Sequence, residues 1–115
     1  MGYDVHITRA AHWTDSESVP ITLPEWRAYL ASDPEMRLDN FAEAKVEGDI
    51  LRYENEGLAV WTDYSRHGEG GNMAWFDYRP GEVVVKNPDK EILAKMRQIA
   101  GSLGARVMGD EGELY

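Results

Sequence analysis

The sequence contains no cysteine among its 115 residues. This absence excludes disulfide bonds, a thiolate nucleophile and zinc sites built on thiolates, and it is typical of a protein from a reducing compartment. Long apolar runs are also missing, because no segment approaches the roughly eighteen consecutive apolar residues of a membrane span. The first residues have neither the basic nor the apolar region of a secretory signal. These absences predict a cytoplasmic protein with no membrane partner.

Basic residues are few. Twelve lysine and arginine residues stand against twenty-one acidic residues, which gives a net charge of -9 at pH 7. The resulting field repels the phosphate backbone of nucleic acids and attracts a basic protein surface. The charge therefore argues against a nucleic-acid partner and favours a basic protein. The length suits one hydrophobic core, so we predict a single domain over residues 1–115.

Two amphipathic helices are predicted. The first follows Thr22, which can form a capping box with Glu25, and it ends before Pro34 because the residue before a proline is pushed out of the helical region. The second opens at residues 87–89, where a cap candidate, a proline and an acidic residue stand together. It ends at Gly104, which suits a left-handed C-cap.

Short strands account for most of the remaining chain. Alternating apolar and polar residues over 3–8 predict a first strand, and turn residues separate the runs between the helices into hairpins. The order β-α-β-β-β-β-β-α-β predicts an α+β fold, in which a mostly antiparallel sheet of five to seven strands has two helices packed on one face. The other predicted strands are 41–46, 50–53, 58–64, 73–78, 83–86 and 105–108.

The sheet face without helices is the candidate interaction surface. If Val60 and Phe76 face the helices, the alternation of strand side chains places two tryptophans and two aspartates together on the open face. Tryptophan is enriched at interface hot spots, and the carboxylates suit a basic partner. Cross-strand packing is the alternative role of the tryptophans, and the register of the strand after Pro80 and Gly81 stays open. The predicted partner-binding residues are Trp61, Asp63, Glu69, Trp75 and Asp77.

His67 offers an alternative, catalytic role. It can act as a general base near neutral pH, with Asp63 or Asp77 to orient it. No recognisable nucleophile accompanies it, because Ser65 lies outside a G-x-S-x-G pattern. The glycine-rich loop 65–72 joins two predicted strands and so lacks the strand-to-helix context of a phosphate-binding loop. The sequence therefore assigns no catalytic residue and leaves His67, Asp63 and Asp77 as the alternative set.

Metal binding is the other chemistry that the residue types permit. Histidines and carboxylates are suitable ligands, but the HExxH pattern is absent and none of the spacings is diagnostic. We expect no bound metal and no cofactor, and a site of histidines and carboxylates stays open as an alternative. The candidate ligands are His6, His12 and His67 with Asp4, Asp15, Asp63 and Asp77.

Four segments resemble a group of small bacterial hypothetical proteins. They are the start YDVHITRAAHW, the central GLAVWTDYS and GNMAWFDYR, and the end VKNPDKEILAKMRQIAGSLGARVMGDEGELY, and the similarity covers nearly the whole chain. The resemblance implies a bacterial origin and a stand-alone domain. Because no activity is assigned to that group, it implies no catalytic or binding residue here.

Two classes of function follow. Small size, strong acidity, a candidate aromatic strip and the lack of a catalytic constellation favour a non-enzymatic protein-binding module, such as an immunity or antitoxin-like inhibitor of a basic protein. The alternative is a small enzyme or ligand-binding domain that uses His67 with Asp63 and Asp77, or a metal held by histidines and carboxylates.

Overall fold

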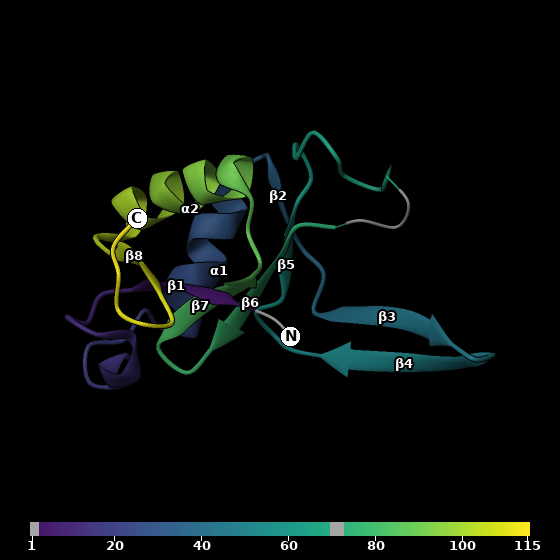
Figure 1. Ribbon diagram of the computed structural model, residues 1–115, viewed down its shortest axis with the longest axis horizontal. Coiled ribbons are helices and arrows are strands. Elements are labelled where there is room, and N and C mark those ends of the chain that lie inside the picture. Colours follow the sequence, from purple (N-terminus) through teal and green to yellow (C-terminus); the bar gives the residue numbers. More distant parts are fainter. Residues whose placement is uncertain (1–2, 70–72) are drawn as a thin grey trace.

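The computed structural model describes residues 3–69 and 73–115, and within them the chain forms eight strands, two α-helices and one short 3-10 helix (Figure 1). The strands are β1 (Asp4–Thr8), β2 (Met36–Leu38), β3 (Phe41–Val46), β4 (Asp49–Glu54), β5 (Ala59–Trp61), β6 (Trp75–Arg79), β7 (Glu82–Lys86) and β8 (Arg106–Gly109). The helices are η1 (Trp13–Asp15), α1 (Leu23–Ser32) and α2 (Lys90–Leu103). The predicted α+β class is confirmed.

The main sheet contains six of these strands in the order β2-β5-β6-β7-β1-β8. All neighbouring pairs are antiparallel. Strand β1, the first in the chain, therefore lies between β7 and β8, the last two in the chain, and not at an edge of the sheet. Neither α-helix in the described part of the chain combines the length and apolar character needed to cross a membrane.

Helix α1 begins as its sequence predicts. The side chain of Thr22 accepts a hydrogen bond from the Glu25 backbone N–H at 3.3 Å, and the Glu25 carboxylate accepts one from the Thr22 N–H at 3.1 Å. Both N–H groups would otherwise lack a partner at the helix start, so the capping box is confirmed. The helix ends at Ser32, two residues before Pro34.

Helix α2 begins slightly later than the turn residues suggest. Its N-cap is Asp89, whose carboxylate accepts from the Ile92 N–H at 2.9 Å, and Pro88 lies outside the helix. Asn87 instead has a positive φ of 49° and accepts a hydrogen bond from the Tyr3 N–H at 2.9 Å. The predicted left-handed cap at the other end is confirmed, since Gly104 has φ 63°.

One hydrophobic core lies between the helices and one face of the main sheet. Side chains from α1 and α2 pack there with those of six strands. As predicted, the apolar stripe of α2 is buried in the same cluster as Phe76. The buried residues of that stripe are Ile92, Met96, Ile99, Ala100 and Leu103, and the sheet contributes Val5, Ile7, Met36, Ala59, Trp61, Phe76, Val83, Val85 and Val107.

The predicted orientation of β5 is wrong. Ala59 pairs with Phe76, and Val60 pairs with Trp75. Directly paired residues share a sheet face, so Trp61 points with Phe76 toward the helices and is only 8% exposed. Val60 points with Trp75 to the other face. The pairing register, which the sequence of one strand does not reveal, decides this orientation.

Three strands differ from the predicted meander. The short strand β2 was not predicted, and it pairs with β5 at the edge of the main sheet. Strands β3 and β4 pair only with each other and project from the body as a hairpin (Figure 1). Because β2 occupies the position beside β5, the hairpin has no place in the main sheet.

The reversal between β6 and β7 settles the register that the sequence left open. Arg79 pairs with Glu82, so Pro80 and Gly81 form a two-residue turn. Gly81 has φ +85°, and proline followed by a residue of positive φ is typical of a type II turn. A side chain at Gly81 would also collide with the carbonyl oxygen of Ser16, 2.4 Å from the position of a Cβ.

The second sheet face is partly covered. The Trp13 ring stacks on His6 of β1 with 4.2 Å between ring centroids, and the Trp13 indole N–H donates to the Asp110 carbonyl at 3.0 Å. Segments outside α1 and α2 thus close this face over β1. The face remains open over β6 and the end of β7, where a pocket lies.

Candidate functional site

The β3–β4 hairpin carries much of the exposed apolar surface. Ile50 is 66% exposed and Leu51 59%, and Phe41 and Tyr53 are also exposed. Leu51 and Tyr53 lie two residues apart and therefore share one hairpin face, while Ile50 lies on the opposite face. A two-stranded hairpin with apolar side chains on both faces gains stability from further packing. These side chains are available for contact with another molecule.

A polar network fixes the base of the hairpin against the open sheet face. The Asp77 carboxylate of β6 accepts hydrogen bonds from the Tyr53 hydroxyl at 3.0 Å and from the Asn55 amide at 2.8 Å. The same amide donates to the Tyr78 carbonyl at 2.6 Å. Because Tyr53 reaches Asp77, the hairpin face of Tyr53 and Leu51 turns toward the open sheet face. Ala42 and Tyr53 at the hairpin base line one pocket together with residues of the open sheet face, and we call this junction the trough.

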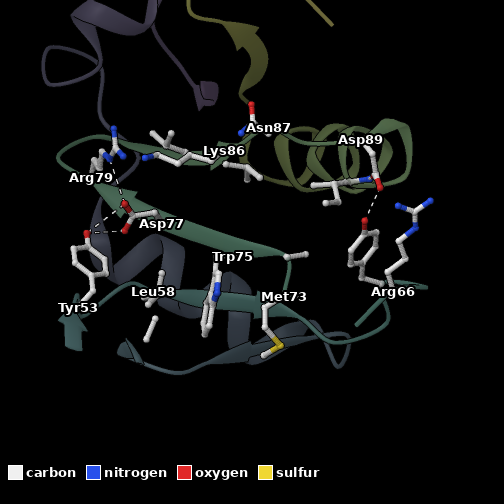
Figure 2. A pocket seen from close by; sticks show the side chains of 16 residues that line it. Tyr53, Leu58, Arg66, Met73, Trp75, Asp77, Arg79, Lys86, Asn87 and Asp89 are labelled. Carbon is white, nitrogen blue, oxygen red and sulfur yellow. Dashed lines mark hydrogen bonds and ion pairs between the residues drawn. The ribbon is translucent and has the colours of Figure 1, made fainter. Parts of the chain in front are cut away.

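The pocket in the floor of this trough has a volume of about 500 Å³. Leu58, Trp75 and Met73 line its floor, and charged side chains stand at its ends (Figure 2). Arg79 and Asp77 lie at one end, and Arg66 and Asp89 at the other (Figure 2). The pocket thus combines an apolar floor with several charged groups, as small-molecule sites commonly do.

The structure separates the five predicted partner-binding residues. Trp75 and Asp77 lie on the open face, but Trp61 lies in the core, so the prediction of one tryptophan strip is wrong. Asp63 and Glu69 are exposed in the segment after β5. Asp77 is held by three donors, from Tyr53, Asn55 and Arg79, and its carboxylate therefore serves the hairpin base.

The alternative catalytic set is not assembled by hydrogen bonds. Within residues 3–69 and 73–115, none joins His67 to Asp63 or Asp77. The Nδ1 atom of His67 is buried without a hydrogen-bond partner in this part of the chain. An unoriented imidazole lacks the partner that holds a general base in the productive tautomer. The predicted loop 65–72 includes residues 70–72, which lie outside the described residues.

Metal ligands do not gather either. Among the residues that the structure describes, no group of three histidines, aspartates or glutamates could hold a metal ion. Each of the three histidines has different neighbours. His6 is buried between two carboxylates, and His12 contacts Thr14. The backbone N–H of His67 donates to the carbonyl of Tyr64.

His6 forms a buried charged cluster that the sequence did not reveal. Its Nδ1 lies 2.6 Å from a Glu82 carboxylate oxygen and its Nε2 lies 2.7 Å from an Asp110 oxygen. Burial alone lowers the pKa of His6, but the hydrogen bonds to Glu82 and Asp110 outweigh it and raise the pKa above the ordinary value. The hydrogen bond from His6 also lowers the pKa of Asp110. Below this raised pKa the ring is an imidazolium, whose two N–H groups donate to Glu82 and Asp110 and so tie β1 to β7 and to the C-terminal segment.

We expect this cluster to make stability fall as the pH rises. A folded-state pKa above the ordinary value of 6.5 stabilises the protein fully below that value, and the contribution disappears as the pH passes through the folded pKa. The loss should be about 1.4 kcal/mol for each unit by which the folded pKa is raised. Urea unfolding of the wild type and of His6→Phe between about pH 5 and pH 9 measures the difference in slope.

Two comparisons make that measurement decisive. His67→Gln removes a histidine outside the cluster and should keep the wild-type slope. Equal slopes in the wild type and His6→Phe would show that the imidazolium contributes no pH-dependent stability.

Lys95 forms a second buried cluster, which accounts for the position of Trp61. The Lys95 side chain is 1% exposed, and its ammonium lies 2.8 Å from Asp33 and 3.0 Å from Glu35. Glu35 also accepts from the Trp61 indole N–H at 3.1 Å, and Asp33 accepts from the Tyr29 hydroxyl. The cluster joins α2, the end of α1 and β5 beneath the helices. Lys95 and Asp33 are buried within it, whereas the Glu35 side chain is 41% exposed at its edge.

Comparison of the chain with protein-family models, with curated proteins and with solved structures gives no match. The resemblance to the small bacterial group therefore stays a prediction. The geometry of the trough and its pocket is the basis for assigning a function.

Proposed function

We propose that the protein is a small, acidic, non-enzymatic binding module whose basic protein partner docks in the trough between the β3–β4 hairpin and the open sheet face. The observation that carries this proposal is the exposure of Ile50 and Leu51 on a projecting hairpin. Apolar side chains so exposed cost free energy in water, and a partner that covers them recovers it.

Charge supports a basic partner. Residues 41–54 carry four carboxylates and two cations, so the hairpin itself has a net charge of -2 within a chain of -9. Its turn bears Glu47 and Asp49, both exposed. Acids around an apolar contact steer a positive surface toward it and contribute mainly to the association rate. An immunity or antitoxin-like inhibitor of a basic toxin is one form of this proposal.

Replacement of Leu51 with aspartate should weaken the complex by about 2 kcal/mol or more, chiefly through faster dissociation, because a charge would replace a buried contact. The protein should stay folded, since changes at exposed positions usually alter stability by less than about 0.5 kcal/mol. Affinity capture from a lysate of the source organism provides the partner, and surface plasmon resonance with the purified partner measures the rates.

Leu114→Asp is the matched control, because Leu114 is 66% exposed and lies near the C-terminus, away from the hairpin. It should bind as the wild type does. The acidic rim is tested separately with Glu47→Gln/Asp49→Asn, which should slow association and weaken its salt dependence. The same charge change in Asp15→Asn/Glu17→Gln should have less effect. Unchanged affinity for Leu51→Asp would remove the hairpin from the interface.

A further inference from the structure

The pocket in the trough floor has features that protein docking on the hairpin does not require. Its volume of about 500 Å³ lies within the range of roughly 300–1,000 Å³ that is typical of small-molecule sites. Tyr53 is the outermost hairpin residue in its lining, and neither Ile50 nor Leu51 contributes to it. The pocket can therefore be tested independently of the docking contact.

Trp75 provides a flat apolar surface in this pocket. The residue is half-buried, and its ring makes none of the aromatic stacking contacts found among the described residues. Leu58 and Val84 lie on the same open face. An indole face beside aliphatic side chains favours a planar apolar group, which gains from both stacking and burial.

Lys86 supplies a positive charge in the same pocket. The pairing of β6 with β7 runs from Arg79 and Glu82 to Asp77 and Val84, and Trp75 and Lys86 lie beyond its last pair. Lys86 is exposed and lines the pocket together with Trp75 (Figure 2). One ligand in this pocket can therefore contact both the indole of Trp75 and the ammonium of Lys86.

The other charges around the pocket are already matched. Arg79 lies 3.3 Å from Asp77 and 3.6 Å from Asp4 of β1, the strand beyond β7. Arg66 faces Asp89, whose pKa is lowered because burial is outweighed by hydrogen bonds from Tyr64 and Ile92 and by the Arg66 charge. In the part of the chain that the structure describes, Lys86 has no such carboxylate partner. One positive charge is thus left for a ligand.

We propose that this pocket binds a small aromatic monoanion, with its ring on the Trp75 indole and its carboxylate on the Lys86 ammonium. The overall negative charge of the protein does not prevent this, because at physiological ionic strength charges beyond about 8 Å are largely screened. The contact between ammonium and carboxylate is local and is a charge-assisted hydrogen bond, the stronger class of such bonds.

Three probes of equal shape test the proposal: naphthalene-2-carboxylate, 2-naphthylmethanol and 2-naphthylmethylamine. They carry a negative charge, no charge and a positive charge on the same ring. Calorimetry should rank the carboxylate first, with the alcohol about tenfold weaker because it lacks the ion pair. In ¹H–¹⁵N spectra, the carboxylate should shift the Trp75 indole signal and the amides of β7.

Lys86→Met keeps the length of the side chain and removes its charge. It should bind the carboxylate about tenfold more weakly and leave the alcohol unchanged. Lys90→Met is the matched control, because Lys90 is exposed and does not line the pocket. Trp75→Leu, checked for folding by circular dichroism, should weaken all three probes.

Three outcomes would overturn the proposal. One is the absence of carboxylate binding at millimolar concentration. Another is equal affinity of the wild type and Lys86→Met for the carboxylate. The third is tighter binding of the ammonium probe, which would show that the carboxylates of the pocket recognise a cation. None of these results tests the Leu51 contact. The docking proposal is tested separately, by the binding measurements on Leu51→Asp.

Discussion

Replacement of Met96 with alanine should lower the free energy of unfolding by about 2–5 kcal/mol. The Met96 side chain is fully buried in the middle of α2 and belongs to the cluster that joins the helices to the sheet. Truncation loses the transfer free energy of the removed atoms and leaves a cavity, which a core already packed from two sides fills only in part.

Urea titration followed by circular dichroism measures this loss. Arg97→Ala, next along the same helix and exposed, is the control for helix propensity and should lie within about 0.5 kcal/mol of the wild type. An unchanged midpoint for Met96→Ala would mean that α2 does not pack on the sheet as described.

The second large effect is expected at Lys95. Lys95→Met keeps most of the side-chain volume but removes the cation from Asp33, which is itself buried. Removal of one partner from a buried ion pair usually costs about 3–5 kcal/mol, because the remaining charge is left in a medium of low dielectric constant. We expect a loss near the lower end, about 3 kcal/mol, since Tyr29 and the Glu35 N–H still donate to Asp33.

The pH dependence identifies the cause. Burial raises the pKa of Asp33, but the hydrogen bonds from Lys95 and Tyr29 outweigh it and lower the pKa below its ordinary value of 3.8. A depressed pKa gives stability that is present above the unfolded value and lost as the pH falls through the folded value. The difference in the free energy of unfolding between the wild type and Lys95→Met should therefore become smaller as the pH falls into the acidic range. Arg97→Met should show neither effect, and a Lys95→Met protein as stable as the wild type would contradict the expected cost.

The sequence predicted those features of the fold that depend on neighbouring residues. The capping box of Thr22 and Glu25 and the left-handed cap at Gly104 need only a few adjacent positions, and both are present. Strand existence was also mostly predictable from short apolar runs. The short strand β2 was missed because three residues offer too few positions for a period to be recognised.

Sheet faces and charged clusters were not predictable in this way. The orientation of Trp61 depends on the register between β5 and β6, and a shift of one residue exchanges the two faces. His6 meets Glu82 across 76 residues of sequence and Asp110 across 104. The pocket charges likewise come together from separate elements: β6, β7, the segment after β5 and the start of α2. The sequence does contain one signal for the projecting hairpin. The adjacent apolar residues Ile50 and Leu51 place apolar side chains on both faces of one strand.

The place of β1 between β7 and β8 has a consequence for how the chain is made. During synthesis the first strand leaves the ribosome long before either of its neighbours exists, and the sheet closes only when β8 has followed. Pairing over such separations is slow, because the entropy of closing a long loop is lost before the contacts form. Until β7 follows, β1 has two unpaired edges, and it keeps one until β8 follows; such edges are templates for association with other chains. Nascent chains halted before β8 should therefore depend on chaperones more than the full-length protein does.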